Sequence, residues 1–450
     1  MDKNFLQDIL KKLKKKGADE ADVVFSSSEN KSSSCRLGEI EKTEESITNE
    51  IGIRVIIKKR QSIISTTNIQ HRNINSLIEK VIEMVKVVPT DEFCGLANKN
   101  QVSIPSKEDI ENLDLCDKYE PDKKEINEKV LLLEQSALNN KKIINSEGAE
   151  LSYTKSKYIL MASNGLESEI TKTHSDYILA VLAGNKSNME RAYDYKSKVF
   201  FNDLGDFNKI GKKVASDALK KIGSKKIKTC KCDVIYDSKV ASSLLSNLFN
   251  ACNASCNASS IIKGTTFLKK KKNKKIFNEN INIIDDPLMK RKLRSRVIDG
   301  EGIGTEEKKL IDNGFLRFFF NCLSTAKQIK EDPSGHGTRY VSSIPSASYT
   351  NLYLKNGKQK KKDMISSLKK GLIITELMGS SVNLSNGDYS RGASGFWIEN
   401  GQISYPVSEI TIAGNLENIF KSLVPADDLE FNFGVNSPSL FIENLTVGGI

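Results

Sequence analysis

The stretch "GDYSRGASGFWIENGQISYPV" (387–407) decides the fold expected for the C-terminal half of the chain. In its second part apolar and polar residues alternate, so that Phe396 and Ile398 would face one side of a strand and Trp397 the other. Asn400-Gly401 interrupts the alternation with a residue pair typical of the tightest hairpin turns, because both positions tolerate a positive φ. We therefore predict a β-hairpin centred on this pair.

The sequence around this hairpin predicts a β-rich C-terminal domain over residues 227–450. A strand is expected at 232–238 and a helix at 239–255, where apolar residues recur at helical spacing. Beyond residue 275, short alternating runs are separated by glycine corners, a pattern typical of a curved antiparallel sheet or a barrel.

The first half of the chain predicts two further units, each mixing helices and strands. Residues 1–88 form an N-terminal α/β domain, 89–122 a connecting segment with three prolines, and 123–226 a central α/β domain. Helices are expected near 5–13, 73–88, 123–139 and 204–222, and strands at 21–28, within 52–68 and along 150–200. The expected fold class is therefore α+β.

Composition bounds the class of protein. A chain of 450 residues is too long for one ordinary core, and 38% hydrophobic with 28% charged residues is typical of a globular protein. No apolar run approaches the roughly 18–20 residues that span a bilayer. The N-terminus lacks the layout of a secretory signal, so we expect a cytoplasmic protein with no membrane association.

The net charge of +11 arises from 68 Lys and Arg against 57 Asp and Glu. The densest basic runs, at 269–275 and 358–362, hold no aromatic residue on which a base could stack. A solvated basic surface is therefore favoured over nucleic-acid binding.

The residues that could carry metal or acid–base chemistry are few and scattered. His71, His174 and His336 have no second histidine at ligand spacing, and His336 lies in a glycine turn that we interpret as a solvated loop. Two cysteine pairs, Cys230 with Cys232 and Cys252 with Cys256, lack the usual C-x-x-C spacing. We favour core packing for them over a structural zinc site.

The polar cluster Asp388, Tyr389, Ser390 and Arg391 precedes the hairpin. A Tyr or Ser with no base beside it is a weak nucleophile, so we assign the cluster no catalysis. It is expected to shape the turn into the hairpin, and with Trp397 it is the candidate surface for a peptide or a partner subunit.

Several long blocks resemble one known family. The segment 375–420, together with 267–303, 348–357 and 437–449, is similar to the C-terminal signature of the TldD/PmbA family, the so-called modulators of DNA gyrase. The resemblance is dense over roughly 230–450 and weaker over the first 220 residues, where mainly the order of elements agrees.

The resemblance implies a metalloprotease system of two related subunits. In the TldD branch a helix of this domain carries an H-E-x-x-x-H motif, and a cysteine near the C-terminus completes the metal site. Aligned on Leu244-Leu245, the motif's positions are occupied here by Ser246, Asn247 and Ala251, and the last cysteine is Cys322. The chain thus resembles the PmbA branch, also called TldE. The resemblance implies no catalytic residue and no cofactor in this chain, with zinc expected in a TldD-type partner.

We therefore expect a non-catalytic subunit that pairs with a TldD-type metallopeptidase and handles unfolded peptides, such as precursor peptides and antitoxin-like proteins. The resemblance implies that unstructured peptides enter a groove as an added strand. Two alternatives stay open. One is a stand-alone metallopeptidase using the cysteine pairs or His336, and the other is a protein that binds gyrase or nucleic acid. Self-dimerisation also stays open.

Overall fold

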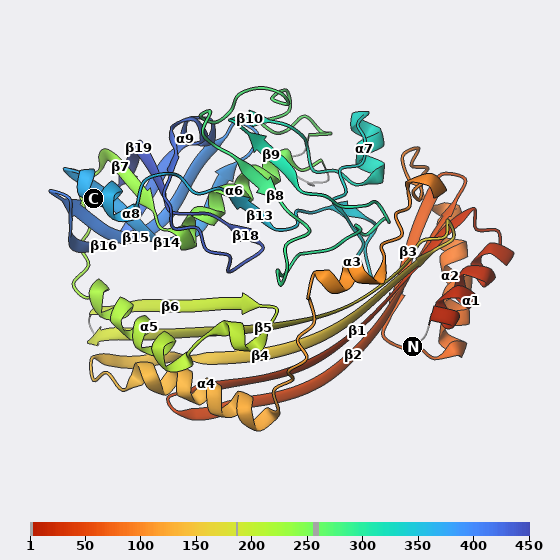
Figure 1. Cartoon of the computed structure of the whole chain (residues 1–450), viewed down its shortest axis with the longest axis horizontal. Helices are drawn as coiled ribbons and strands as arrows, with labels where there is room; N and C mark the ends of the chain where they lie inside the picture. The colour runs from red at the N-terminus through yellow and green to blue at the C-terminus, as the bar shows by residue number, and fades with distance from the viewer. Residues whose placement is uncertain (1–2, 186–187, 255–260) are drawn as a thin grey trace.

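The structure is a computed structural model that describes residues 3–185, 188–254 and 261–450. Cys256 of the second cysteine pair lies outside the described residues. The architecture is α+β, as predicted: a long curved sheet lies beneath a β-rich C-terminal half (Figure 1).

One antiparallel sheet of six strands runs through both N-terminal units, in the order β3-β2-β1-β4-β5-β6. Its strands are β1 (Glu20–Arg36), β2 (Glu39–Ile57), β3 (Arg60–Thr66), β4 (Ile143–Ala162), β5 (Glu167–Asn185) and β6 (Asn188–Lys198). The central pairing joins the two units, because β1 runs against β4 from Asp22 opposite Ala162 to Cys35 opposite Ala149. The expected strand at 21–28 is therefore much longer than its apolar pattern.

Four helices cover one face of this sheet. Helices α1 (Lys3–Lys15) and α2 (His71–Val87) pack over one end, against Val23, Phe25 and Ile159. Helices α4 (Lys123–Leu138) and α5 (Phe207–Lys221) pack over the other end, against Leu151 and Tyr177. These strand residues share one parity on β1 and β4, so both helix pairs lie on the same face. The opposite face is left for the C-terminal half.

The connecting segment and the β6–α5 link hold short helices: η1 (Lys99–Gln101), α3 (Lys107–Asn112) and η2 (Phe201–Leu204). The open face of the sheet carries Val24, Leu160 and Ala162, which pack with Ile298 of the C-terminal half. The two halves therefore share a small apolar core.

The C-terminal half contains a closed barrel, which confirms the predicted curved, barrel-like sheet. Its strands are β7 (Cys230–Tyr236), β14 (Lys370–Asn383), β15 (Asp388–Glu399), β16 (Gln402–Asn415) and β19 (Leu440–Gly448), and β16 pairs with β19 to close the ring. The short strand β17 (Val424–Pro425) pairs with β19. Helices α8 (Lys361–Ser367) and α9 (Leu416–Ser422) flank these strands.

A second, smaller sheet packs beside the barrel in the order β10-β9-β8-β13-β18. Its strands are β8 (Ile283–Asp285), β9 (Lys308–Asp312), β10 (Phe315–Leu316), β13 (Leu352–Leu354) and β18 (Val435–Asn436). The remaining elements are α7 (Leu323–Ile329) and the strand pair β11 (Gly337–Thr338) and β12 (Ser346–Ala347).

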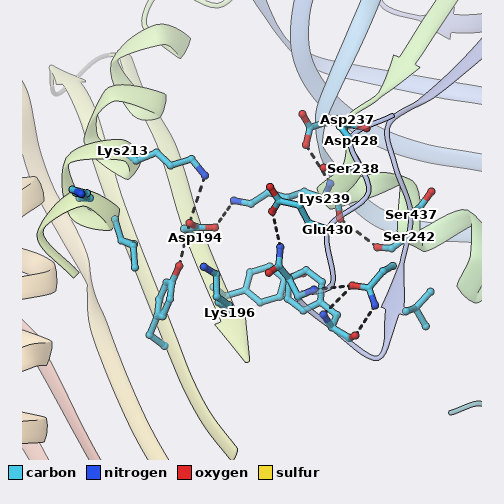
Figure 2. Close-up of a pocket in the computed structure, with 18 residues that line it drawn as sticks. Asp194, Lys196, Lys213, Asp237, Ser238, Lys239, Ser242, Asp428, Glu430 and Ser437 are labelled. Carbon is cyan, nitrogen blue, oxygen red and sulfur yellow. Dashed lines mark hydrogen bonds and ion pairs between the residues drawn. The ribbon is translucent and has the colours of Figure 1, made fainter. Parts of the chain in front are cut away.

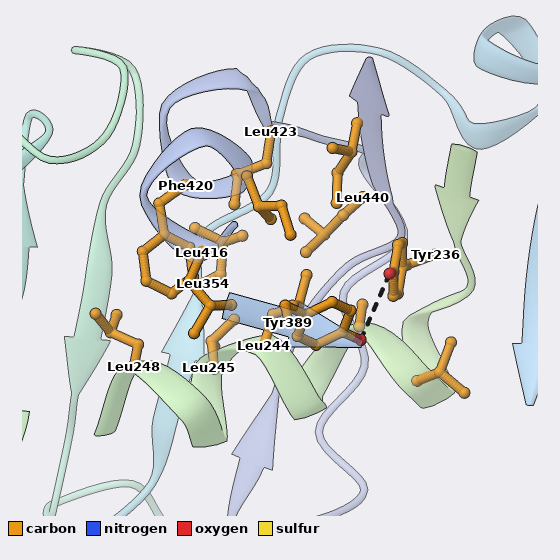
Figure 3. Packing of buried hydrophobic residues seen from close by; sticks show 14 of the residues in the cluster. Tyr236, Leu244, Leu245, Leu248, Leu354, Tyr389, Leu416, Phe420, Leu423 and Leu440 are labelled. Atoms are coloured by element: carbon orange, nitrogen blue, oxygen red, sulfur yellow. Dashed lines mark hydrogen bonds between the residues drawn. The ribbon is translucent and has the colours of Figure 1, made fainter. Parts of the chain in front are cut away.

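Helix α6 (Ser238–Cys252) supplies much of the largest core. Leu244, Leu245 and Leu248 pack with Leu354 and Phe420 (Figure 3). The predicted hairpin is confirmed in detail. Asn400 and Gly401 have φ of 50° and 74°, as this turn requires. Trp397 belongs to the same core as α6, whereas Phe396 and Ile398 pack on the other side of β15.

Candidate functional site

A cleft lies between the edge of the long sheet and the barrel half (Figure 2). Its volume is about 430 Å³, and its walls come from β6, α5, the start of α6 and the loop before β18. A second hollow of about 520 Å³ shares Lys213, Asp237 and Lys239 with it and continues toward β14 and β16. The two hollows form one extended groove.

Strand β6 borders this groove as the last strand of its sheet. No further strand pairs with β6 among the described residues. Lysines reach its outward carbonyls instead: Lys221 Nζ donates to Arg191 O (2.9 Å) and Lys239 Nζ donates to Tyr193 O (3.4 Å). The free edge of a sheet is a template for an extended peptide, and here a peptide would have to displace the two lysines.

Asp194 on β6 organises the charges of the cleft. Its carboxylate lies 2.6 Å from Lys239 Nζ and 3.9 Å from Lys213 Nζ, and it accepts a hydrogen bond from Tyr177 Oη (3.3 Å). Burial, then the charge of Asp194, raises the pKa of Tyr177, so its hydroxyl stays protonated. These contacts hold the lysines in place along the edge strand.

The other wall of the cleft is the first part of α6. Asp237 caps the helix by accepting from Lys239 N (3.2 Å) and also pairs with Lys361. Ser238, Lys239 and Ser242 line the cleft. Aromatic contact is available as well, because the rings of Tyr195 and Phe433 lie 4.9 Å apart beside these polar groups. The cleft therefore offers the apolar and hydrogen-bonding groups that peptides use.

The positions aligned with the metal motif follow on the same helix. Ser246 lies one turn beyond Ser242, and its hydroxyl donates to Ser242 O (3.2 Å). Asn247 is half-buried, and its Nδ2 has no hydrogen-bond partner among the described residues. Ala251 is buried, and its carbonyl accepts from Thr266 Oγ1 (2.9 Å).

This donor set does not fit zinc. A hydroxyl bonded back to its own helix, a neutral amide and a methyl group replace the imidazole and carboxylate donors that zinc prefers. Within the described ranges, no three His, Cys, Asp or Glu side chains are grouped to hold a metal ion.

The cluster before the hairpin is divided between surface and core. Asp388 is exposed and accepts from Asn386 Nδ2 (2.7 Å). Tyr389 is buried in the barrel core, with its hydroxyl 3.5 Å from that of Tyr236. Ser390 and Arg391 are half-buried on β15. Trp397 is also buried, and its Nε1 donates to Glu399 (3.2 Å). Asp388 is thus the member of the set most open to a partner.

His336 is not the solvated loop residue that the sequence suggested. It is 3% exposed, stacks on Phe318 and bonds Asp285 Oδ1 through Nε2 (3.1 Å) and Ser334 Oγ through Nδ1 (2.9 Å). Burial tends to raise the pKa of Asp285, but hydrogen bonds from His336 and Thr350 outweigh it and lower that pKa. The glycine turn that carries His336 is buried because the buried carboxylate of Asp285 needs hydrogen-bond donors.

The serine of this chain of hydrogen bonds is not a nucleophile. Ser334 is 7% exposed, and its hydroxyl donates to Asn321 O (3.1 Å) while accepting from Asn321 N (3.1 Å). A substrate carbonyl has no access to an oxygen held in this way, so the network is structural.

The other candidates lie apart from the cleft. His71 packs edge-on against Phe5, and His174 lies 3.4 Å from Asp176. Cys230 and Cys232 lie half-buried on β7, and burial raises the pKa of the Cys252 thiol. In the basic run 269–275, Lys271 and Lys272 pair with Glu417 and Glu331.

The sequence did not point to the cleft residues Asp194, Lys213 and Lys239. Each is a single charged residue in an ordinary strand or helix pattern, and only the fold brings them together.

No helix in the described ranges is long and apolar enough to cross a membrane.

The chain matches the three successive domain models of one protein family. Family models match in chain order: PmbA/TldA metallopeptidase domain 1 at residues 21–85, the central domain at 103–222 and the C-terminal domain at 229–449. The chain belongs to the PmbA/TldD family.

The alignments with individual relatives cover nearly the whole length of this chain. A metalloprotease PmbA homologue of Buchnera aphidicola (from Acyrthosiphon pisum) is 30% identical over 400 residues, which are 88% of this chain and 86% of the relative. A Bacteroides thetaiotaomicron protein described as a modulator of DNA gyrase superposes with a TM-score of 0.89 at 28% identity, covering 100% and 99% of the two chains. TldE of Thermococcus kodakarensis shares the fold, with a TM-score of 0.86 at 21% identity over 98% and 99%.

Proposed function

We propose that this chain is the TldE-type subunit of a two-subunit, cytoplasmic metallopeptidase that processes or degrades unfolded peptides. The observation that carries the proposal is the groove itself. The outer edge of β6, to which no strand of the described residues adds, faces the helix on which Ser246, Asn247 and Ala251 occupy the positions of the expected metal motif. The chain has a surface suited to a peptide, and its described residues include no group of donors that could hold a metal ion.

The proposed peptide adds to β6 as an antiparallel or parallel strand. The carbonyls of Arg191 and Tyr193 would then accept from peptide amides in place of Lys221 and Lys239. The freed ammonium groups remain beside the peptide, where they favour acidic side chains or backbone carbonyls. Only a segment without its own secondary structure can present its backbone in this way, which accounts for a preference for unfolded chains.

Peptide hydrolysis near neutral pH needs an activated water, and metal coordination lowers the pKa of water from about 15.7 to about 7. In the proposed complex a TldD-type subunit supplies that water. The present chain holds the peptide so that the bond to be cleaved lies beside that water. Precursor peptides and antitoxin-like proteins are substrates of the expected kind.

The test compares the isolated chain, a TldD-type subunit alone and the two mixed. Cleavage of an unfolded peptide is measured together with bound metal in each purified sample. We expect turnover by the mixture alone, with zinc carried by the TldD-type subunit. Stoichiometric zinc together with turnover by the isolated chain would instead favour a stand-alone metallopeptidase.

The same preparations test the remaining alternative. Salt-dependent retardation of DNA by the isolated chain would support a nucleic-acid role. We expect none at low salt, because the basic run at 269–275 is partly neutralised by Glu417 and Glu331.

A further inference from the structure

A cavity of about 300 Å³ lies at the junction of the long sheet and the C-terminal half, and it shares Ile110, Ser168, Glu169 and Ile170 with a neighbouring hollow of about 970 Å³. Its walls come from β4 and β5, from Ile110 of α3, from the loop 296–300 and from residues 338–340 at the end of β11. None of its lining residues borders the peptide cleft described above. Most of the wall surface consists of apolar atoms, and Leu160, Ile170 and Ile298 are among the apolar side chains that line it.

Three cations line this mainly apolar cavity: Lys172, Arg296 and Arg339. Lys172 Nζ donates to the carbonyl of Ser295 (2.5 Å), which is neutral. Burial, with the charges of Arg296 and Arg294, lowers the pKa of Lys172 to about 7. A lysine in such surroundings gains strongly from any anion placed beside it.

The carboxylates that line the cavity are already engaged. Glu169 is bound by Lys157 (2.7 Å) and Lys3 (3.3 Å). Asp299 accepts from three backbone amides, those of Glu301 (2.8 Å), Ile303 (3.0 Å) and Gly337 (2.8 Å). The lining cations therefore exceed the anions available to them.

Two buried guanidinium nitrogens have no hydrogen-bond acceptor among the described residues. Arg339 is 2% exposed; its Nε binds Asp22 (2.9 Å), but its Nη2 has no partner among the described residues. Arg296 donates through Nη1 to Gly337 O (3.1 Å), and its buried Nε is likewise unpartnered within the described ranges. Buried donors without acceptors are rare, because each loses its hydration without replacement.

We propose that this cavity binds a carboxylate carrying a small apolar body. The carboxylate would accept from Lys172, and the positive charges of Arg296 and Arg339, which also line the cavity, would add to the attraction. The apolar body would lie against Leu160, Ile170 and Ile298. The volume is at the small end of ligand sites, which suits a single amino-acid-sized group. Such a group exists as a free acid and as the C-terminal residue of a peptide.

Calorimetric titration of the full chain at constant ionic strength tests the proposal, with N-acetyl-L-leucine as the probe. We expect measurable binding of this acid and at least tenfold weaker binding of N-acetyl-L-leucinamide, which has the same body without the charge. Inorganic phosphate should also bind at least tenfold more weakly, because it gains nothing from the apolar walls. A short peptide ending in leucine, with a free or amidated C-terminus, separates the two sources of the group.

Measurements on variants show whether the acid binds in this cavity. Lys172→Met should weaken the acid at least tenfold, and Ile170→Trp should abolish binding by filling the cavity. Lys155→Met, on β4 outside the lining, is the matched control and should bind as the wild type does. Thermal melting confirms that each variant is folded. Equal affinity for acid and amide, equal affinity for phosphate, or unchanged binding by folded Lys172→Met would overturn the proposal.

Discussion

Asp22 on β1 and Arg339 in the C-terminal half form a buried ion pair with an Oδ1–Nε distance of 2.9 Å. The second oxygen of the same carboxylate binds Arg54 Nε (2.5 Å) on β2. Asp22 is 2% exposed and both arginines are almost as deeply buried. One carboxylate thus joins two strands of the long sheet to a loop more than 300 residues away in the chain.

Asp22→Asn should destabilise the protein strongly. The amide keeps the shape but leaves two buried guanidinium groups without a counter-charge, and breaking a buried pair in this way costs about 3–5 kcal/mol. Urea unfolding measures the loss. Glu79→Gln, which removes the exposed partner of Lys16, is the control and should not change the midpoint measurably. A loss for Asp22→Asn no larger than that of the control would show that the pair does not hold the halves together.

The free energy of unfolding should depend on pH because of the buried carboxyl group of Glu301. Burial, then the charge of Asp299, raises the pKa of Glu301 to about 8. Between pH 4.5 and 8 the folded state therefore keeps a proton that the unfolded chain has released, so stability falls as pH rises through this window. Glu301→Gln should remove this decline, a difference on the order of 2 kcal/mol between pH 6 and 9.

The comparison is made by denaturant unfolding across pH, with Glu306→Gln as the control because the Glu306 side chain is 73% exposed. The glutamine oxygen can still accept from Leu323 N, as Glu301 Oε2 does at 2.7 Å. Parallel pH profiles for wild type and Glu301→Gln would contradict the assignment.

Gly211→Ala should destabilise the packing of α5 on α4. A Cβ at this position would lie 2.3 Å from Leu133 O and 2.8 Å from Ser136 Cβ, and the first of these is backbone that cannot move aside cheaply. Overpacking of this kind costs about 1–3 kcal/mol, which exceeds the roughly 1 kcal/mol that alanine gains over glycine in a helix. Lys212→Ala, exposed on the same helix, should leave the melting temperature unchanged. A higher melting temperature for Gly211→Ala would show that the two helices can separate freely.

The sequence was most informative where a local rule applied. Asn400-Gly401 required one turn type, and the helical spacing of Leu244, Leu245 and Leu248 located α6. It was least informative along β1, where the serine-rich run 26–34 shows no apolar alternation, although the strand continues to Arg36. The long shared sheet depends on pairing between β1 and β4, more than 100 residues apart, and no local pattern records it.

The residues of the candidate site likewise divide into those that the sequence indicated and those that only the fold brings together. Ser246, Asn247 and Ala251 followed from a resemblance between sequences, whereas Asp194, Lys239 and the edge of β6 came together only in the fold. His336 was misjudged because a glycine turn is usually exposed. Here Asp285, far away in the chain, draws the imidazole inward.

The proposed role of the β6 edge can be tested by removing one backbone donor. Tyr193 O accepts from Lys239 across the groove, and within a strand the N–H and C=O of one residue point the same way. The N–H of Tyr193 therefore faces the groove, away from β5. Tyr193→Pro should remove this donor without breaking the ladder to β5, and an unfolded peptide that pairs with β6 should bind at least tenfold more weakly.

Tyr193→Ala is the matched control, because it removes the ring but keeps the N–H. Binding of a fluorescent unfolded peptide to the isolated chain is measured by anisotropy for both variants. If the peptide adds as a strand, the proline variant loses far more affinity than the alanine variant. Equal losses would mean that the tyrosine ring, and not the strand edge, holds the peptide. The carboxylate cavity shares no residue with this edge. N-acetyl-L-leucine should therefore bind both variants as tightly as it binds the wild type. The outcome for one proposal does not depend on the outcome for the other.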